Sequence, residues 1–561
     1  MEIYPACGFN GLNDFPARSI LGEKVLIFDE KMDMKLVQSV IDSVFELQGG
    51  KNNEFTDSRF ALLFTPGEYD LDIPVGYYTQ VLGLGRLPQD VLIRGEVHSN
   101  AGSRGHVLTN FWRSVENLSI EPLNDSVNTW GVSQAAPIRS VIVHGNLNLF
   151  DRGYSSGGFM ADCMIEGEVQ FGSQQQWFSR NSSWESCSRG SWNIFSLGVN
   201  GAPTTTYPDG QFTSLDSTPV SRSKPFLFAS RGELKFMVPE VQKKSKGPSW
   251  NQPVLAGREI PLSEFYIARP ENDNAKTLNM ALQNGKHVLF TPGIYHIENP
   301  LRIVKEATIM AGIGMPSLVA KNQDAVIIVE KSDGIILSGL LLDAGMDSTN
   351  VLLKLGETPE EQSILHEPSW CYDIFCRVGG PGAASVNQCV VVNSNDVFMD
   401  NMWIWRADHG NGVGWDTNRS QNGIVVNGNR VTVYGLFNEH HQGYQAIWNG
   451  NNGQVFMYQS EMPYDPPSVD AWRNGEKGGF PSYIVSEDVT SHEAWGVGVY
   501  CVFYNAPVQV DCAVETPGIL EDSIHHKFTV WLGGNPESIL HHIINDKGKS
   551  VSVENRKSTL E

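Results

Sequence analysis

The chain has 561 residues and a formal net charge of −22, and such an acidic surface repels nucleic acid, anionic membrane lipid and polyuronate, which favours a neutral partner. No run of about 20 apolar residues suits a membrane span. The length exceeds one ordinary globular core, and 55 Gly with only 19% charged residues favour a turn-rich, mostly β protein of several domains or stacked repeats.

The first residues, Met-Glu-Ile-Tyr-Pro-Ala-Cys, lack both the basic and the apolar region of a secretion signal. We expect that a signal preceded them and was removed, so that the protein is secreted and extracellular. The removed signal and the extracellular location are both predictions about the localisation of the protein.

The opening elements of the chain occur twice. Residues 33–50 repeat apolar positions at helical spacing and end in Gly-Gly, and residues 61–71 are typical of a strand, a Pro-Gly turn and a second strand. The same order returns near residues 272–284 and 287–297. We expect a duplicated chain in which each half begins with a helix that covers the end of a stack of strands. The repeated motif Phe-Thr-Pro-Gly-x-Tyr stands at Phe64–Tyr69 and Phe290–Tyr295.

The rest of each half consists of strands of three to six residues that are broken by Asn-Gly and Asp-Gly type turns, without helices between them. This pattern predicts parallel β-helices, with a sandwich or a propeller as the alternative. A stretch poor in apolar residues, about 242–252, predicts a linker. We therefore expect a β-helix over residues 1–240, a linker over 241–262 and a second β-helix over 263–561.

Two glutamates in the second half, Glu439 and Glu461, are 22 residues apart. One coil of such a solenoid takes roughly 20 to 30 residues, so this interval predicts two carboxylates on neighbouring rungs of one sheet face. Aligning the strands by hand puts Trp405 and Glu493 in the same column. A slip of one residue would turn every side chain to the opposite face.

Two carboxylates on adjacent rungs, with Cβ atoms about 5 Å apart, repel one another, and burial among Trp448, Tyr458 and Tyr464 also disfavours charge. One of them should keep its proton near neutral pH and serve as a general acid, while the other orients water or stabilises positive charge on a sugar ring. The alternative is that Glu439 pairs with a neighbouring histidine and Glu461 caps a turn.

Aromatic and amide side chains near these acids are typical of a carbohydrate subsite, because a sugar packs its C–H face on indole and its hydroxyls bind amides. Two or three of the tryptophans should instead belong to the core. In the first half, strand alternation sends Gln174 and Gln176 to one face. We expect one of them to hold water across a cleft between the halves, with an internal glutamine ladder as the alternative. The tryptophans are Trp403, Trp405, Trp415, Trp448, Trp472 and Trp495.

Neither Asp408-His409 nor His440-His441 has the spacing of a known metal site, and the eight cysteines include no Cys-x-x-Cys pair. We predict no metal and no organic cofactor. Buried free thiols, or one or two disulfides, are expected, and Cys371 with Cys376 is the first pair to test.

Several motifs together resemble glycoside hydrolase family 55, the β-1,3-glucanases or laminarinases. They are the two Phe-Thr-Pro-Gly-x-Tyr openings, Gly-Ser-Gln-Gln-Gln-Trp-Phe-Ser-Arg-Asn at 172–181, Trp-Arg-Ala-Asp-His-Gly at 405–410, Gly-Leu-Phe-Asn-Glu-His at 435–440 and Tyr-Gln-Ser-Glu-Met-Pro-Tyr-Asp-Pro at 458–466.

The resemblance implies two right-handed parallel β-helices packed side by side, and a monomer that acts on β-1,3-glucan and releases glucose with inversion. It makes Glu461 the general acid, and it puts Glu439 and either Gln174 or Gln176 near the catalytic water. The substrate-binding residues expected around them are Trp405, Asp408, His409, Trp448, Tyr458, Gln459, Tyr464, Asp465 and Trp472.

Two other functions remain open for a β-helix of this kind. A polysaccharide lyase would need a basic cleft, usually with calcium, and the net charge opposes one. A non-catalytic carbohydrate-binding or adhesive β-helix would need no acid pair.

Overall fold

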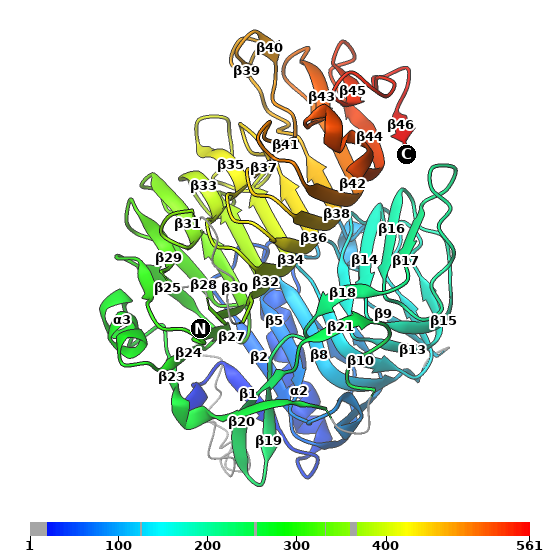
Figure 1. Cartoon of the computed structure of the whole chain (residues 1–561). Helices are drawn as coiled ribbons and strands as arrows, with labels where there is room; N and C mark the ends of the chain where they lie inside the picture. Colours follow the sequence, from blue (N-terminus) through cyan, green and yellow to red (C-terminus); the bar gives the residue numbers. More distant parts are fainter. Residues whose placement is uncertain (1–19, 124–125, 252–254, 331–332, 360–366) are drawn as a thin grey trace.

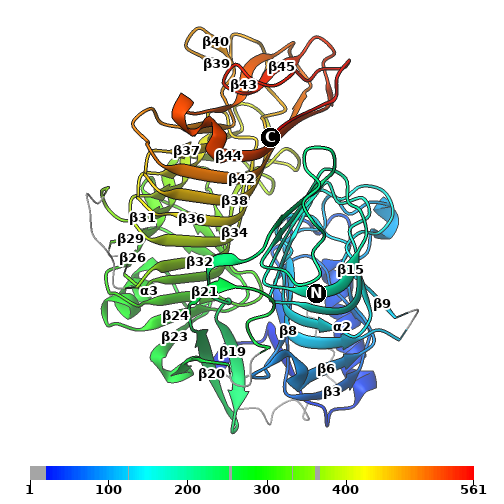
Figure 2. The ribbon, with the colours of Figure 1, turned by 45° about the vertical axis from the view of Figure 1, so that its right-hand side comes forward.

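The computed structural model describes residues 20–123, 126–251, 255–330, 333–359 and 367–561. The expectation for the first seven residues, Cys7 included, lies outside this part of the chain. Strands dominate, and Figures 1 and 2 show the first half of the chain beside the second half. Helix α2 (Met34–Gln48) belongs to the first half and helix α3 (Ala275–Gln283) to the second.

The first half contains a 15-stranded sheet in which strands from successive turns of the chain pair in parallel. Apolar side chains on these strands point inward and form one core cluster with the buried face of α2. The main path of the sheet runs through β1 (Val25–Phe28), β2 (Phe60–Phe64), β5 (Thr79–Gly83), β8 (Arg113–Glu121), β10 (Ile138–Val143), β12 (Phe159–Ala161), β14 (Gln176–Arg180), β16 (Asn193–Leu197) and β17 (Phe212–Leu215).

The second half is a parallel β-helix, because from β29 onward the chain mostly alternates between a 13-stranded and a 9-stranded sheet, one strand in each per coil. The first path comprises β23 (Phe265–Ala268), β24 (His287–Phe290), β27 (Ile309–Gly312), β30 (Ile336–Asp343), β32 (Ser369–Val378), β34 (Val397–Arg406), β36 (Thr432–Glu439), β38 (Gly453–Glu461), β42 (His492–Phe503), β44 (Ile524–Gly534) and the antiparallel β46 (Lys557–Leu560). The second comprises β26 (Leu301–Ile303), β29 (Ala325–Val329), β31 (Thr349–Leu355), β33 (Ala384–Val392), β35 (Asn418–Val426), β37 (Ala446–Trp448), β41 (Tyr483–Val485), β43 (Gln509–Glu515) and β45 (Ile539–Ile544).

The repeated Phe-Thr-Pro-Gly-x-Tyr motif builds the same turn in both halves. The hydroxyl of Tyr69 donates to the carbonyl of Thr65 at 2.7 Å, and the hydroxyl of Tyr295 donates to the carbonyl of Thr291 at 3.0 Å. Each hydroxyl also reaches a carbonyl of the preceding coil. The duplicated sequence therefore marks two equivalent starting coils.

The segment predicted as a linker, 241–262, is itself paired. Strand β21 (Gln242–Ser245) runs antiparallel to β18 (Thr218–Ser221), and β22 (Gly257–Pro261) runs antiparallel to β20 (Glu233–Pro239). Strand pairing therefore holds residues 242–245 and 257–261 of this segment in place.

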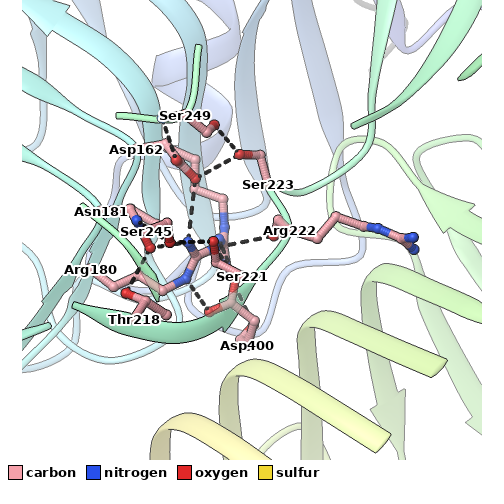
Figure 3. Close-up of polar contacts among 12 residues, drawn as sticks. Asp162, Arg180, Asn181, Thr218, Ser221, Arg222, Ser223, Ser245, Ser249 and Asp400 are labelled. Carbon is pink, nitrogen blue, oxygen red and sulfur yellow. Dashed lines mark hydrogen bonds and ion pairs between the residues drawn. The ribbon is translucent and has the colours of Figure 1, made fainter. Parts of the chain in front are cut away.

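Buried ion pairs join the two halves. Arg139 binds Asp373 at 2.7 Å and Asp400 at 3.0 Å. Arg180 binds Asp400 at 2.6 Å (Figure 3). Burial alone would raise the pKa of Asp373, but Arg139 and Lys224 lower it to about 2. Such pairs need good geometry to offset the cost of removing charge from water, and these contacts fix one half against the other.

Of the two alternatives left open for the cysteines, buried free thiols hold for Cys371 and Cys376, the first pair to test. Both lie in β32. Five positions along one strand span about 16 Å, whereas a disulfide joins Cα atoms about 4.4 to 6.8 Å apart.

Candidate active site

A cleft of about 1010 Å³ lies between the two halves. Both halves contribute to it, so neither forms the site alone. Among its lining residues are Phe111, Gln134, Ser156, Gln175 and Trp192 from the first half, and Trp403, Trp405, Asp408, His409, Glu439, Glu461, Tyr464, Tyr504 and Trp531 from the second.

The two glutamates stand on adjacent rungs of one sheet. Glu439 ends β36, Glu461 ends β38, and the two are direct partners in the register, with Trp405 of β34 one rung before them. This part of the predicted column is confirmed. All three side chains line the cleft.

The predicted place of Glu493 in the column is wrong, because Tyr500 is the partner of Glu461 and Glu493 pairs with Gln454. The coil between β38 and β42 holds an extra hairpin, β39 (Arg473–Asn474) and β40 (Lys477–Gly478), which lengthens it beyond the preceding coil. The prediction counted eight residues on from Val485, which lies in β41 of the other sheet, and so placed the wrong residue on the rung.

Glu439 is almost fully buried and well supplied with donors. Trp403 donates from Nε1 to Oε2 at 2.8 Å, and Gln134 donates from Nε2 to Oε1 at 3.1 Å. Burial raises the pKa of Glu439 to about 7, although both donors oppose the rise. This carboxylate can still ionise near neutral pH.

Glu461 has weaker support for a negative charge, since its hydrogen bond from Gln459 is long, at 3.4 Å. Burial first, and then the charges of Glu439 and Asp408, raise its pKa well above the usual value. The raised pKa favours the protonated form of Glu461, whose side chain lines the cleft. The charged form is better supported at Glu439, because the donors that reach Glu439 are closer than the one that reaches Glu461.

Gln134 and Ser156 are functional candidates that the sequence reasoning missed. The hydroxyl of Ser156 donates to Oε1 of Gln134 at 2.8 Å, and Gln134 reaches Glu439 across the cleft. The two are 22 residues apart, which is the interval that drew attention to the glutamates, so the same coil spacing could have found them.

Gln174 and Gln176 are both buried, and neither is among the residues that line the cleft. Gln174 donates to the carbonyls of Val132 and Leu149, at 2.9 and 2.6 Å. Gln176 donates to the carbonyl of Ser156. Gln175 lines the cleft instead.

The predicted substrate-binding residues divide into two groups. Trp405, Asp408, His409 and Tyr464 line the cleft. The others lie elsewhere: Trp448, Tyr458 and Trp472 are buried in the core of the second half, Gln459 is buried beside Glu461, and Asp465 forms an ion pair with Arg406 at 2.8 Å.

His409 bridges two carboxylates, with Nε2 at 2.5 Å from Glu54 and Nδ1 at 2.8 Å from Asp408. Burial would lower the pKa of His409, but these two partners raise it to about 10. Burial alone would raise the pKa of Asp408, but His409 lowers it to about 2. His441 is buried against Ser420, and burial lowers its pKa to about 3. Within the described ranges, no group of three His, Cys, Asp or Glu side chains could hold a metal.

An acid pair with different protonation, set among indoles and amides in a cleft beside a β-helix, defines a hydrolase of polysaccharides. The family model of the LAM55 pectate lyase-like domain matches residues 265–461. An exo-beta-1,3-glucanase of Streptomyces sp. (strain SirexAA-E / ActE) is 40% identical over 537 residues, which cover 95% of this chain and 87% of the relative.

Solved structures give the same answer. The structure of sacteLam55A from Streptomyces sp. SirexAA-E matches with a TM-score of 0.92 at 39% identity, over 96% of this chain and 98% of that one. A variant of sacteLam55A in complex with glucose matches with a TM-score of 0.93 over the same shares. The chain belongs to the Lam55 family, and it is a glycoside hydrolase of the exo-β-1,3-glucanase type. None of the helices described is long and apolar enough to cross a membrane.

Proposed function

We propose that this enzyme removes glucose from the ends of β-1,3-glucan chains by single-step hydrolysis with inversion. The observation that carries the proposal is the pairing of Glu439 with Glu461 on adjacent rungs of a cleft wall. The name of the Streptomyces relative and the glucose complex of sacteLam55A support the choice of substrate and product.

Glu461 is the general acid of this reaction. Its burial and the neighbouring negative charges keep it protonated at the pH where Glu439 begins to ionise. The proton passes to the glycosidic oxygen as the bond to the anomeric carbon breaks, so the departing sugar leaves as a neutral alcohol.

Glu439, Gln134 and Ser156 hold the attacking water. Both oxygens of Glu439 already accept hydrogen bonds, from Trp403 and Gln134, which suits a carboxylate that takes a proton from water better than one that attacks carbon. Ser156 fixes the side-chain amide of Gln134 by a hydrogen bond. Gln134 belongs to the first half and faces the sheet that carries Glu461, so the water reaches the sugar from the side of the first half. This replaces Gln174 and Gln176 as the proposed water holders.

Product analysis tests the proposal. Time-resolved proton NMR on laminarin should show α-glucose first, because inversion of a β-linkage yields the α-anomer, with β-glucose appearing only by mutarotation. Initial release of β-glucose would exclude inversion, and initial release of oligosaccharides would exclude action at chain ends.

We also propose that the chain forms two tandem right-handed β-helices whose first coils are covered by α2 and α3, and that it works as a secreted monomer. The equivalent starting turns support the tandem arrangement. A polymeric substrate supports a place outside the cell. We expect the activity to be recovered from the culture medium of the producing organism. In sedimentation it should behave as a particle of 62.0 kDa.

A further inference from the structure

A second cavity follows the Trp405 end of the cleft. It measures about 260 Å³, lies between the two halves, and is lined by Phe55, Arg59 and Arg377 among others. The ring of Phe55 stacks on Trp405, with centroids 6.5 Å apart and an interplanar angle of 6°. Because Trp405 lines the cleft and Phe55 lines the second cavity, this pair of rings separates two hollows along the same interface.

Phe55 fits closely into the second half. Gly380 and Gly410 contact its ring, and a Cβ atom added to either would lie 2.5 or 2.8 Å from ring carbons. Their φ angles, 93° and 112°, also belong to the left-handed region that favours glycine. The backbone of the second half is therefore shaped to receive an aromatic ring from the first.

Glu54 makes the adjoining contact. Its buried carboxylate holds His409, whose other nitrogen holds Asp408, so one residue of the first half fixes two cleft-lining residues of the second. The ring of His409 also lies 6.1 Å from that of Phe55. Charge and ring contacts thus close the same end of the cleft.

The segment that carries these two residues is firmly held. The hydroxyl of Tyr78 donates to the carbonyl of Glu54 at 2.7 Å, and Arg377 of the second half donates to that hydroxyl at 2.6 Å. Asn53 donates to the carbonyl of Leu47 at 2.7 Å. The segment is anchored on both sides of the interface.

We propose that Trp405 and His409 form the end wall of the cleft, and that Phe55 and Glu54 hold this wall in place and thereby determine that the enzyme acts on chain ends. Trp405 is one rung before Glu439 and two rungs before Glu461, so this wall stands within roughly 10 Å of the acid pair, with Phe55 stacked behind it. The space between the wall and the acid pair suits one terminal sugar, and the wall stops a chain from continuing into the second cavity. The inference rests on the proposed hydrolysis of β-1,3-glucan.

The test uses laminarin oxidised with periodate and then reduced. Periodate cleaves the vicinal diols of the non-reducing terminal glucose but spares 3-linked residues inside the chain, so an enzyme confined to chain ends has no intact terminus to hold. Wild type should release glucose from laminarin and nothing from the oxidised polymer. The double variant Glu54→Ala/Phe55→Ala should release oligosaccharides from the oxidised polymer. Met346→Ala, which changes an exposed residue that lines the second cavity but not the cleft, is the control and should behave as wild type.

A double variant that hydrolyses laminarin but leaves the oxidised polymer intact would overturn the assignment. If the double variant is inactive on both polymers, Phe55→Ala is tested in its place with the same two polymers. Inactivity of both variants at an unchanged unfolding temperature would also overturn the assignment, because the wall is not needed for bond cleavage. Wild type that releases no glucose from laminarin would instead refute the proposed function.

Discussion

Gln134 of the first half donates a hydrogen bond to Glu439 of the second half at 3.1 Å, although 305 residues separate them in the chain. The indole of Trp403 holds the other oxygen of the same carboxylate. The carboxyl that stays ionisable is thus supported from both halves, whereas Glu461 receives only one long hydrogen bond. The interface between the halves therefore favours the charged form of Glu439 over that of Glu461.

Replacing Glu461 by Gln should abolish glucose release while the protein stays folded. An amide of the same shape cannot donate a proton to the leaving oxygen, and the loss of a general acid lowers kcat by roughly 10² to 10⁴-fold. Glucose release from laminarin measures kcat, and thermal unfolding checks the fold. Glu493→Gln is the matched control, because Glu493 lies on the next strand of the same sheet but off the acid rung, and it should keep wild-type activity. A rate near wild type for Glu461→Gln would remove it from the mechanism.

The pH profile should carry the signature of the coupled acids. The pKa of Glu461 is raised by burial and then by Glu439, and a carboxyl with a raised pKa keeps its proton below that pKa and loses it as pH rises through it. We expect kcat/KM to fall on the alkaline side. In Glu439→Gln the neighbouring charge is gone, so the pKa of Glu461 drops and the residual activity should fall at lower pH than in wild type. An alkaline limb that does not move would contradict this coupling.

The coil spacing predicted the acid pair because stacked parallel strands convert sequence intervals into position. Glu439 and Glu461 are separated by one short coil, and the register follows from that interval alone. The prediction for Glu493 was wrong because it started from Val485, a residue of the other sheet, in a coil that a hairpin lengthens. Repeat length is readable from sequence only while the turns between strands keep the same length.

Which face a strand buries was harder to predict. Gln174 and Gln176 are polar and yet buried away from the cleft, and Gln174 donates to two backbone carbonyls there. Trp448 and Trp472 are core residues although their chemistry suits sugar. Nothing local to these residues tells the interior of one half from the cleft between two, because the cleft exists only after the halves have docked.

Replacing Gln134 by Leu should lower kcat by about 10²-fold. The side chain keeps its approximate size but can neither donate to Glu439 nor accept from Ser156, so water loses one holder. The pKa of Glu439 should also rise further, because the Gln134 hydrogen bond lowers it. Initial rates on laminarin at several pH values measure both effects. Gln170→Leu is the control, since Gln170 contacts only Glu168 through its amide and lies outside the cleft lining. Equal rates for the two variants would exclude Gln134 from water positioning.

Replacing Asp400 by Asn should destabilise the protein without touching the cleft. Asp400 is fully buried and binds Arg180 at 2.6 Å and Arg139 at 3.0 Å, so its loss leaves two guanidinium groups of the first half without their shared carboxylate. Breaking a buried pair in this way costs about 3 to 5 kcal/mol, and calorimetry should record a clearly lower unfolding temperature. Asp416→Asn removes an aspartate from an exposed pair with Arg419 at 2.7 Å and should leave that temperature nearly unchanged, because exposed pairs contribute little. Similar unfolding temperatures for the two variants would mean that the buried pairs do not hold the halves together.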